Sequence, residues 1–191
     1  MKNLMSLPIV SICLIISIGC AGMHYGTGVS HLKQQDYKDA IDSFNIVLEK
    51  NPEYPNAHTQ LGIAYYKTEM YDQAISELQT ARKLQNSDKR ARLFLGMAYL
   101  KHGKMDDAIS EWNSYLEMFP SSNVSDLLRK GVAALKSGES LPETVDLMTG
   151  SIETIIAQED KIRDWDYSYR VGNFGYGHRY LHHHGYYYPC D

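Results

Sequence analysis

Residues 55–88 read PNAHTQLGIAYYKTEMYDQAISELQTARKLQNSD, and residues 89–122 read KRARLFLGMAYLKHGKMDDAISEWNSYLEMFPSS. The two stretches align without an insertion, and residues 21–54 align with both in the same register. Four columns keep their residue type in all three units: Gly28, Gly62 and Gly96; Lys33, Lys67 and Lys101; Ala40, Ala74 and Ala108; Ile41, Ile75 and Ile109. The chain is therefore built around a 34-residue repeat, and a period of this length indicates a solenoid.

Each unit has two apolar-periodic halves with a short break between them. The breaks fall at Gln35-Asp36, Glu69-Met70 and Gly103-Lys104, so we expect two antiparallel helices in each unit. A Gly in mid-helix costs roughly 1 kcal/mol relative to Ala, so the repeated Gly predicts a packing requirement. The repeated Ala lies on the partner helix, where two small residues would let the backbones approach closely.

The repeat carries a recognisable motif. The second unit has Leu61-Gly62-x-x-Tyr65, and the third has Leu95-Gly96-x-x-Tyr99, each followed by the Ala column. Further positions of the pattern are Leu78, Ala81, Trp112 and Pro120. Over residues 21–122 the chain resembles the tetratricopeptide repeat family. The resemblance implies an all-α superhelical solenoid of three helix-turn-helix units (21–54, 55–88 and 89–122). The first unit departs at Thr27 and His31, as expected of a terminal repeat.

Two further helices are predicted after the repeats, within residues 123–165. Apolar residues at 123–137 indicate a capping helix, which such arrays need for solubility. Ser140-x-x-Glu143 has the form of a capping box and starts a second pattern that runs to about Trp165, with Gly150 weakening its middle enough to allow two helices. Residues 143–165 have three alternative roles: an extra packing helix on the cap, a self-association surface in a homo-oligomer, or a cover for the solenoid's own groove.

The N-terminus reads as a lipoprotein signal peptide over residues 1–19. Lys2 precedes an apolar run from Leu4 to Ile18, which is too short and too broken for a comfortable membrane span. The run ends in Ser17-Ile18-Gly19-Cys20, which resembles the lipobox of bacterial lipoproteins. The resemblance implies cleavage before Cys20 and acylation of that residue, by palmitate among other chains, with sorting to the outer membrane facing the periplasm. A plain signal peptide or an uncleaved anchor is the alternative.

Residues 166–191 form a segment rich in Tyr, Gly and His that has no apolar period, and we expect it to be a disordered tail. Five of its side chains are weak candidates for a metal site: His178, His182, His183, His184 and Cys190. Imidazole and thiolate suit Zn, Cu or Ni. Because no established metal-ligand spacing is present, a solvated tail without a dedicated metal is the simpler interpretation.

The groove is the main candidate site. In the tetratricopeptide family the first helix of each unit lines the concave face. Carried over to this chain, that face presents Val29, Leu32 and Lys33, then Ile63, Tyr66 and Lys67, then Arg90, Met97, Leu100 and Lys101. An apolar face with regularly spaced Lys suits an amphipathic helix or an extended segment with apolar anchors and acidic residues.

One subclass of the family grips a peptide's terminal carboxylates with Lys, Asn and Arg. The matching positions here include Tyr25, Val29, Ile63 and Phe94, so that clamp is largely absent, although Arg90 remains.

Several function classes are excluded or disfavoured. No nucleophile elbow, Walker loop or Gly-rich turn occurs, so we expect no enzyme activity and no cofactor. The net charge of −4 and the lack of a basic run argue against a nucleic-acid partner. The sequence therefore predicts a non-catalytic, lipid-anchored adaptor for protein–protein interaction in the bacterial envelope. The alternative is a metal- or surface-binding lipoprotein that acts through its tail.

Overall fold

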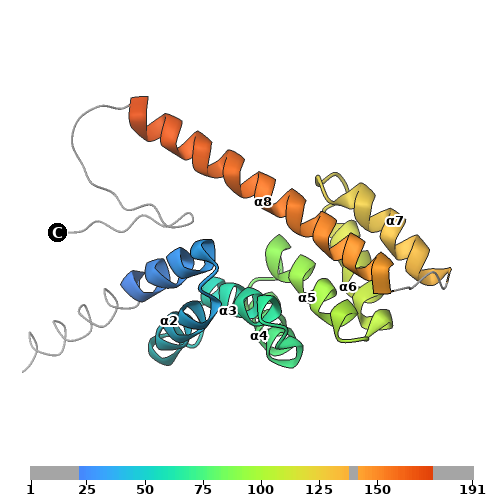
Figure 1. Ribbon diagram of the computed structural model, residues 1–191, viewed down its shortest axis with the longest axis horizontal. Coiled ribbons are helices and arrows are strands. Elements are labelled where there is room, and N and C mark those ends of the chain that lie inside the picture. The colour runs from blue at the N-terminus through green and yellow to red at the C-terminus, as the bar shows by residue number, and fades with distance from the viewer. Residues whose placement is uncertain (1–21, 138–141, 174–191) are drawn as a thin grey trace, which may run out of the picture.

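The computed structural model of the chain describes residues 22–137 and 142–173, with side-chain contacts as far as residue 164. Every regular element in these ranges is an α-helix (Figure 1). A helix over residues 22–34 is followed by α2 (Tyr37–Lys50), α3 (Pro55–Lys67), α4 (Tyr71–Leu84), α5 (Lys89–Lys101), α6 (Met105–Met118), α7 (Ser125–Lys136) and α8 (Pro142–Asn173). The predicted all-α architecture is confirmed.

The period of the sequence is preserved in the helices. The helices α2, α4 and α6 begin at Tyr37, Tyr71 and Met105, which are 34 residues apart. The residue at each hairpin turn has a left-handed backbone: Gln35 at φ 66°, Glu69 at φ 62° and Gly103 at φ 79°. Residues in this conformation commonly end helices, and only the third unit uses the glycine that adopts it without strain. All three predicted breaks therefore lie where the chain reverses.

The glycines at the repeated position, Gly28, Gly62 and Gly96, are needed for packing as predicted, but the residues that they contact most closely differ from the prediction. A β-carbon on Gly96 would lie 2.0 Å from Nε1 of Trp112, and one on Gly28 would lie 2.7 Å from Cε1 of Phe44. The glycine of α3 has the same relation to Leu78 of α4, at 2.6 Å from its Cγ. In the second unit this β-carbon would also lie 3.3 Å from the carbonyl oxygen of Ala74, so the predicted approach of Gly and Ala occurs there, but it is not the closest contact of any of the three glycines. Each glycine instead makes room for a large side chain of the second helix, which is fully buried there.

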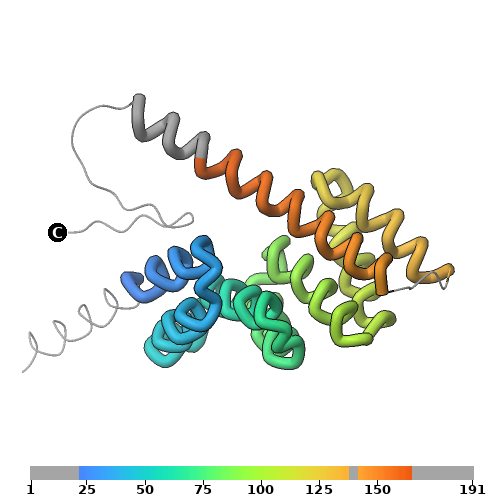
Figure 2. Tube along the Cα trace, viewed as in Figure 1, coloured from blue at the N-terminus to red at the C-terminus, as the bar shows by residue number. Residues whose placement is uncertain are grey.

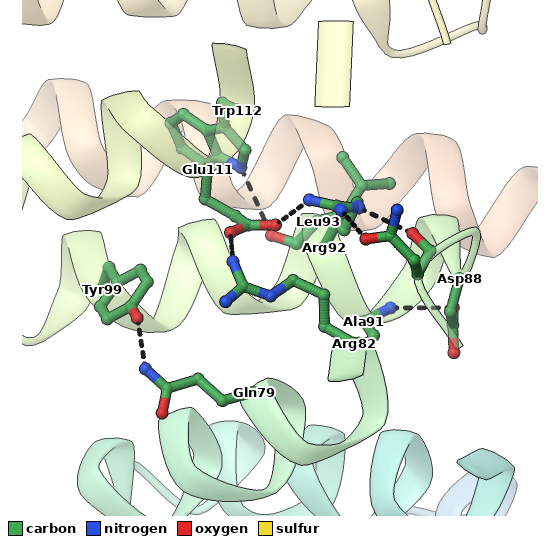
Figure 3. A network of polar contacts seen from close by, with 10 residues as sticks. Gln79, Arg82, Asp88, Ala91, Arg92, Leu93, Tyr99, Glu111 and Trp112 are labelled. Atoms are coloured by element: carbon green, nitrogen blue, oxygen red, sulfur yellow. Dashed lines mark hydrogen bonds and ion pairs between the residues drawn. The ribbon is translucent and has the colours of Figure 1, made fainter. Parts of the chain in front are cut away.

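A buried ionic network joins α4, α5 and α6 (Figure 3). Glu111 of α6 is 4% exposed and accepts hydrogen bonds on both oxygens, one from Arg82 of α4 and one from Arg92 of α5, the latter at 2.6 Å. Nε of Arg92 also donates to the carbonyl of Asn86 at 3.0 Å. Because each buried charge has a partner, the network fixes how the second repeat meets the third.

The capping helix is α7, with Val124, Leu128, Val132 and Leu135 buried. After it, α8 is one helix that continues to Asn173. The prediction of an end near Trp165 was therefore wrong by eight residues. The tail predicted to start at residue 166 begins inside this helix, and the suggested division at Gly150 does not occur. A small helical residue on the exposed side does not break a helix whose other side is packed.

Helix α8 does not continue the stacking direction of the solenoid. It starts beside α7 and runs back diagonally over α5 toward helix 22–34 (Figures 1 and 2). This path places it on the side of the solenoid where the first helices of the three units lie.

Other expectations concern residues outside the described ranges. The signal peptide at 1–19, the lipidation site Cys20 and the metal candidates His178, His182, His183, His184 and Cys190 all belong there. No helix in the described part of the chain is long and apolar enough to cross a membrane.

Candidate protein-interaction groove

The groove of this solenoid is the face formed by helix 22–34, α3 and α5. Its apolar floor contains Val29, Ile63, Tyr66, Phe94, Met97 and Leu100, each at most 7% exposed. The rings of Tyr66 and Phe94 meet edge to face with centroids 5.4 Å apart, which ties α3 to α5 at the centre of the floor. The structure thus brings together the predicted groove residues of all three units.

The three repeated lysines each meet an acidic residue of α8. Nζ of Lys33 lies 3.0 Å from Asp164, Nζ of Lys67 lies 2.5 Å from Glu153, and Lys101 pairs with Asp146. The hydrogen bond with Asp146 raises the pKa of Lys101. As α8 runs from its start toward residue 164, it therefore passes the third, second and first units in turn.

The spacing of these acids has a geometric reason. Asp146, Glu153 and Asp160 are seven residues apart, which is about 10.5 Å along a helix at 1.5 Å per residue. Neighbouring packed helices lie about 8–10 Å apart, and α3 and α5 are such neighbours. This interval therefore lets Asp146 and Glu153 reach Lys101 and Lys67 of neighbouring units. Asp160 meets the third unit again, at Arg90, and the first unit is reached by Asp164.

Arg90 adds a fourth ionic contact. Its guanidinium pairs with Asp160 of α8, which also pairs with Arg163 one turn further along the same helix. The one basic residue of the carboxylate clamp that survives in this sequence is therefore engaged by an acid of the chain itself. The neighbouring clamp positions carry the apolar residues Val29, Ile63 and Phe94, which cannot hydrogen-bond a carboxylate at a peptide terminus.

The first half of α8 is also held by apolar packing. Met148, Ile152 and Ile156 are at most 6% exposed, and Met148 fills the space left by Gly131 of α7. Tyr66 of the groove floor lies beneath this half, where burial raises the pKa of its hydroxyl far above the usual value and the charge of Glu153 adds to the shift.

Beyond Ile156, burial in α8 is described for residues 157–164, which are called its second half below. None of these residues is buried. Ile162 is 66% exposed there, and the pair Lys33–Asp164 is more than half exposed on both sides. Two cavities border this half. One, of about 260 Å³, lies between Val29, Leu32, Ile63 and Phe94 on the floor and Ala157 of α8. The other, of about 370 Å³, lies on the far side of Arg90 and is lined more by polar residues.

Sequence reasoning found the groove but missed the acids that occupy it. Asp146, Glu153, Asp160 and Asp164 were not singled out, although the seven-residue spacing of Asp146 and Glu153 matches the step between neighbouring units. That spacing was the available signal. Of the three alternative roles for residues 143–165, the structure has α8 covering the groove while its start also packs on α7.

Metal ligands and buried charges are the other features to consider among the described residues. Among them, no group of three or more His, Cys, Asp or Glu is placed to hold a metal ion. The buried charges are saturated: Glu111 has two arginine partners, and His58 is held between Glu77 at 2.7 Å and the carbonyl of Pro52 at 2.8 Å. What this face does in the structure is bind an acidic amphipathic helix.

Comparison with known proteins gives a consistent fold. Residues 59–123 match a family model described as tetratricopeptide repeat, and residues 28–69 match one described as TPR repeat. No protein with a curated description matches the chain in sequence.

Solved structures of similar fold come from several proteins. The first TPR domain of human RPAP3 is 27% identical with a TM-score of 0.57, covering 63% of this chain and 95% of that one. The first TPR of Spaghetti (RPAP3) bound to the HSP90 peptide SRMEEVD is 24% identical with a TM-score of 0.58, covering 62% and 94%. The *Yersinia enterocolitica* type III secretion translocator chaperone SycD is 16% identical with a TM-score of 0.59, covering 63% and 86%.

Proposed function

Because residues 28–123 belong to the tetratricopeptide repeat family, whose arrays are protein-interaction modules, we propose that this chain is a non-catalytic adaptor. Its groove binds a helical segment of a partner protein. Its N-terminus anchors it to the bacterial envelope through a lipid on Cys20. The adaptor holds its partner at the membrane surface, where it takes part in assembling or positioning a protein complex.

The observation that carries the proposal is the seating of α8. Three lysines that recur at the same position of each unit all face acids on one helix, and the floor between them is apolar. A groove that accepts this helix has the width, the charge and the apolar character to accept another of the same kind.

The partner segment differs from the one named for a related fold. The RPAP3 domain was solved with an HSP90 peptide. In this chain the corresponding clamp positions are mostly apolar, and Arg90 is engaged by Asp160. The groove therefore favours acids along the side of a helix over the carboxylates of a peptide terminus.

The lipid anchor rests on the sequence pattern Ser17-Ile18-Gly19-Cys20. Metabolic labelling with a palmitate analogue tests it: the wild-type protein takes up label and sediments with the outer membrane, while Cys20→Ala does neither. Label on both proteins, or on neither, contradicts the anchor and leaves the groove untouched.

A photo-crosslink in living cells tests the adaptor function. A photoreactive residue replaces Leu32, which borders the cavity beside Ala157, in one strain. It replaces Ser76, which is exposed on α4, in a matched control strain. We expect a discrete crosslinked partner from position 32 and none from position 76. Crosslinks from position 32 that reach only α8 of the same chain would contradict an adaptor that uses this groove.

A further inference from the structure

Building on the proposed function, we propose that residues 157–164 of α8 are a displaceable occupant of the groove. The helix that replaces them belongs to a partner protein. It is amphipathic and acidic, and it carries a large apolar residue where α8 has Ala157. The free protein thus closes half of its own binding site, and partner binding opens it.

The way α8 is attached supports a division at Ile156. Up to that residue the helix is fixed by buried Met148 and Ile152. Beyond it the contacts with the solenoid include the ion pairs Arg90–Asp160 and Lys33–Asp164 and a hydrogen bond from the amide of Asn123 to Glu159 at 2.8 Å. Lys33 and Asp164 are more than half exposed, and Arg90 and Asp160 are 25% and 32% exposed. Polar contacts that reach water and have no buried apolar residue beside them hold a helix weakly, because water and salt screen the charges and because ordering long side chains costs entropy. Residues 157–164 can therefore leave while residues 142–156 stay.

The cavity beside Ala157 indicates which side chain would fill this part of the groove better than α8 does. The floor there is Val29, Leu32, Ile63 and Phe94, all apolar. The apolar residues that α8 places at the cavity are Ile156 at its edge and the small Ala157, and about 260 Å³ is left unfilled. Packed interfaces leave little space larger than a water molecule. An occupant with Leu, Met or Phe at this position would bury the floor that α8 leaves uncovered.

The charges define the rest of the partner's pattern. Within the displaced segment, Asp160 faces Arg90 and Asp164 faces Lys33, and Ala157 lies three residues before Asp160. A partner helix that follows the same course has a large apolar residue, an acid three positions later and a second acid four positions after that. This is the chemistry by which the segment would be recognised.

Hydrogen exchange on the full-length protein tests the closure without any partner. A detached piece of this length is not a stable helix alone, so its amides report opening. We expect amides of residues 157–164 to exchange at least ~10-fold faster than those of 145–156, and to speed up between ~50 and ~500 mM NaCl while the others do not. Equal protection of both halves at both salt concentrations overturns the proposal.

Peptide binding tests the replacement. The probe is a fluorescent synthetic peptide of residues 153–168 with Ala157→Leu, added to full-length protein. The double variant Asp160→Lys/Asp164→Lys should bind it at least ~10-fold more tightly than wild type, because like charges now face Lys33 and Arg90. The control Glu49→Lys/Glu117→Lys makes the same charge change at exposed positions of α2 and α6 and should bind as wild type does.

A second variant works in the opposite direction. Ala157→Leu in the full-length chain fills the cavity from within, so it should slow exchange at 157–164 and weaken peptide binding below that of wild type. Fast exchange at 157–164 with equal peptide affinity for all variants overturns the replacement step. The proposed adaptor function has its own test: it would be contradicted if no partner protein is crosslinked from position 32.

Discussion

The two halves of α8 cover the same groove in different ways. Residues 142–156 bury Met148, Ile152 and Ile156 between α5, α7 and the groove floor. Residues 157–164 bury nothing and reach the solenoid through charged side chains. The difference shows that one continuous helix can be a structural cap at its start and a weakly held ligand further along. Continuity of secondary structure therefore says little about uniform strength of attachment.

The largest expected effect comes from the packed half. Ile152→Ala should lower the free energy of unfolding by about 2–5 kcal/mol, because it leaves a cavity at a fully buried site. Ile162→Ala is the matched control in the other half, at 66% exposure, and should change stability by less than ~0.5 kcal/mol. Urea denaturation measures both, and similar values for the two variants would remove the distinction between the halves.

A pH change should alter the stability of the solenoid without changing how α8 is attached to it. Both ring nitrogens of His58 face acceptors, Glu77 and the carbonyl of Pro52, so the protonated ring is favoured, and the hydrogen bond to Glu77 raises the pKa of His58 above 6.5. A raised folded-state pKa means that the stabilisation is complete below pH 6.5 and is lost as pH rises through the folded value.

Thermal unfolding checks this directly. The transition of the wild-type protein should move to lower temperature between pH 6 and pH 8.5, and that of His58→Gln should move less. The ion pairs of α8 with the groove contain only Lys, Arg, Asp and Glu, whose ordinary pKa values lie outside this pH range. The protection of amides 157–164, measured relative to the exchange rate of an unfolded chain at the same pH, should therefore not change. A transition that rises with pH would contradict the role of His58.

The smallest effects distinguish ion pairs along α8. Glu153→Ala removes an acid that is 30% exposed and lies beside Lys67 and Tyr66, and should cost about 1 kcal/mol. Asp164→Ala removes an acid that is 56% exposed and should cost less than ~0.5 kcal/mol. Chemical denaturation compares the two, and a larger loss for Asp164→Ala would show that the second half is held more strongly than its exposure indicates.

The sequence was most informative about features that depend on residues close together in the chain. The 34-residue period and the breaks at Gln35, Glu69 and Gly103 follow from spacing, and the structure has them where spacing indicated. The apolar groove floor was expected from the resemblance to the tetratricopeptide repeat family, and its residues are buried as a group. The steric need at the repeated glycine was also visible. The residues that pack against these glycines, such as Trp112 and Phe44, could not be identified. In the sequence they are two apolar residues among many, and their contact with glycine depends on how the two helices cross.

Long-range placement was the part that spacing could not settle. Lys33 and Asp164 are 131 residues apart, and no local pattern states that α8 turns back over the groove. The pattern therefore left three roles open for residues 143–165. The end of α8 at Asn173 was missed because residues 166–173 have no apolar period, yet they continue a helix that is already formed. The lipidation of Cys20 stays a prediction.

A distance measurement tests the central claim most directly. Nitroxide labels are placed at Gln34→Cys and Lys161→Cys, both exposed, in a full-length chain whose three native cysteines are replaced by serine. Pulsed electron resonance then gives the distribution of distances between helix 22–34 and the second half of α8. We predict a narrow short-distance population in low salt and a second, longer population that grows in ~500 mM NaCl and with Asp160→Lys/Asp164→Lys. A single narrow distance under all three conditions would mean that α8 is a fixed part of the fold.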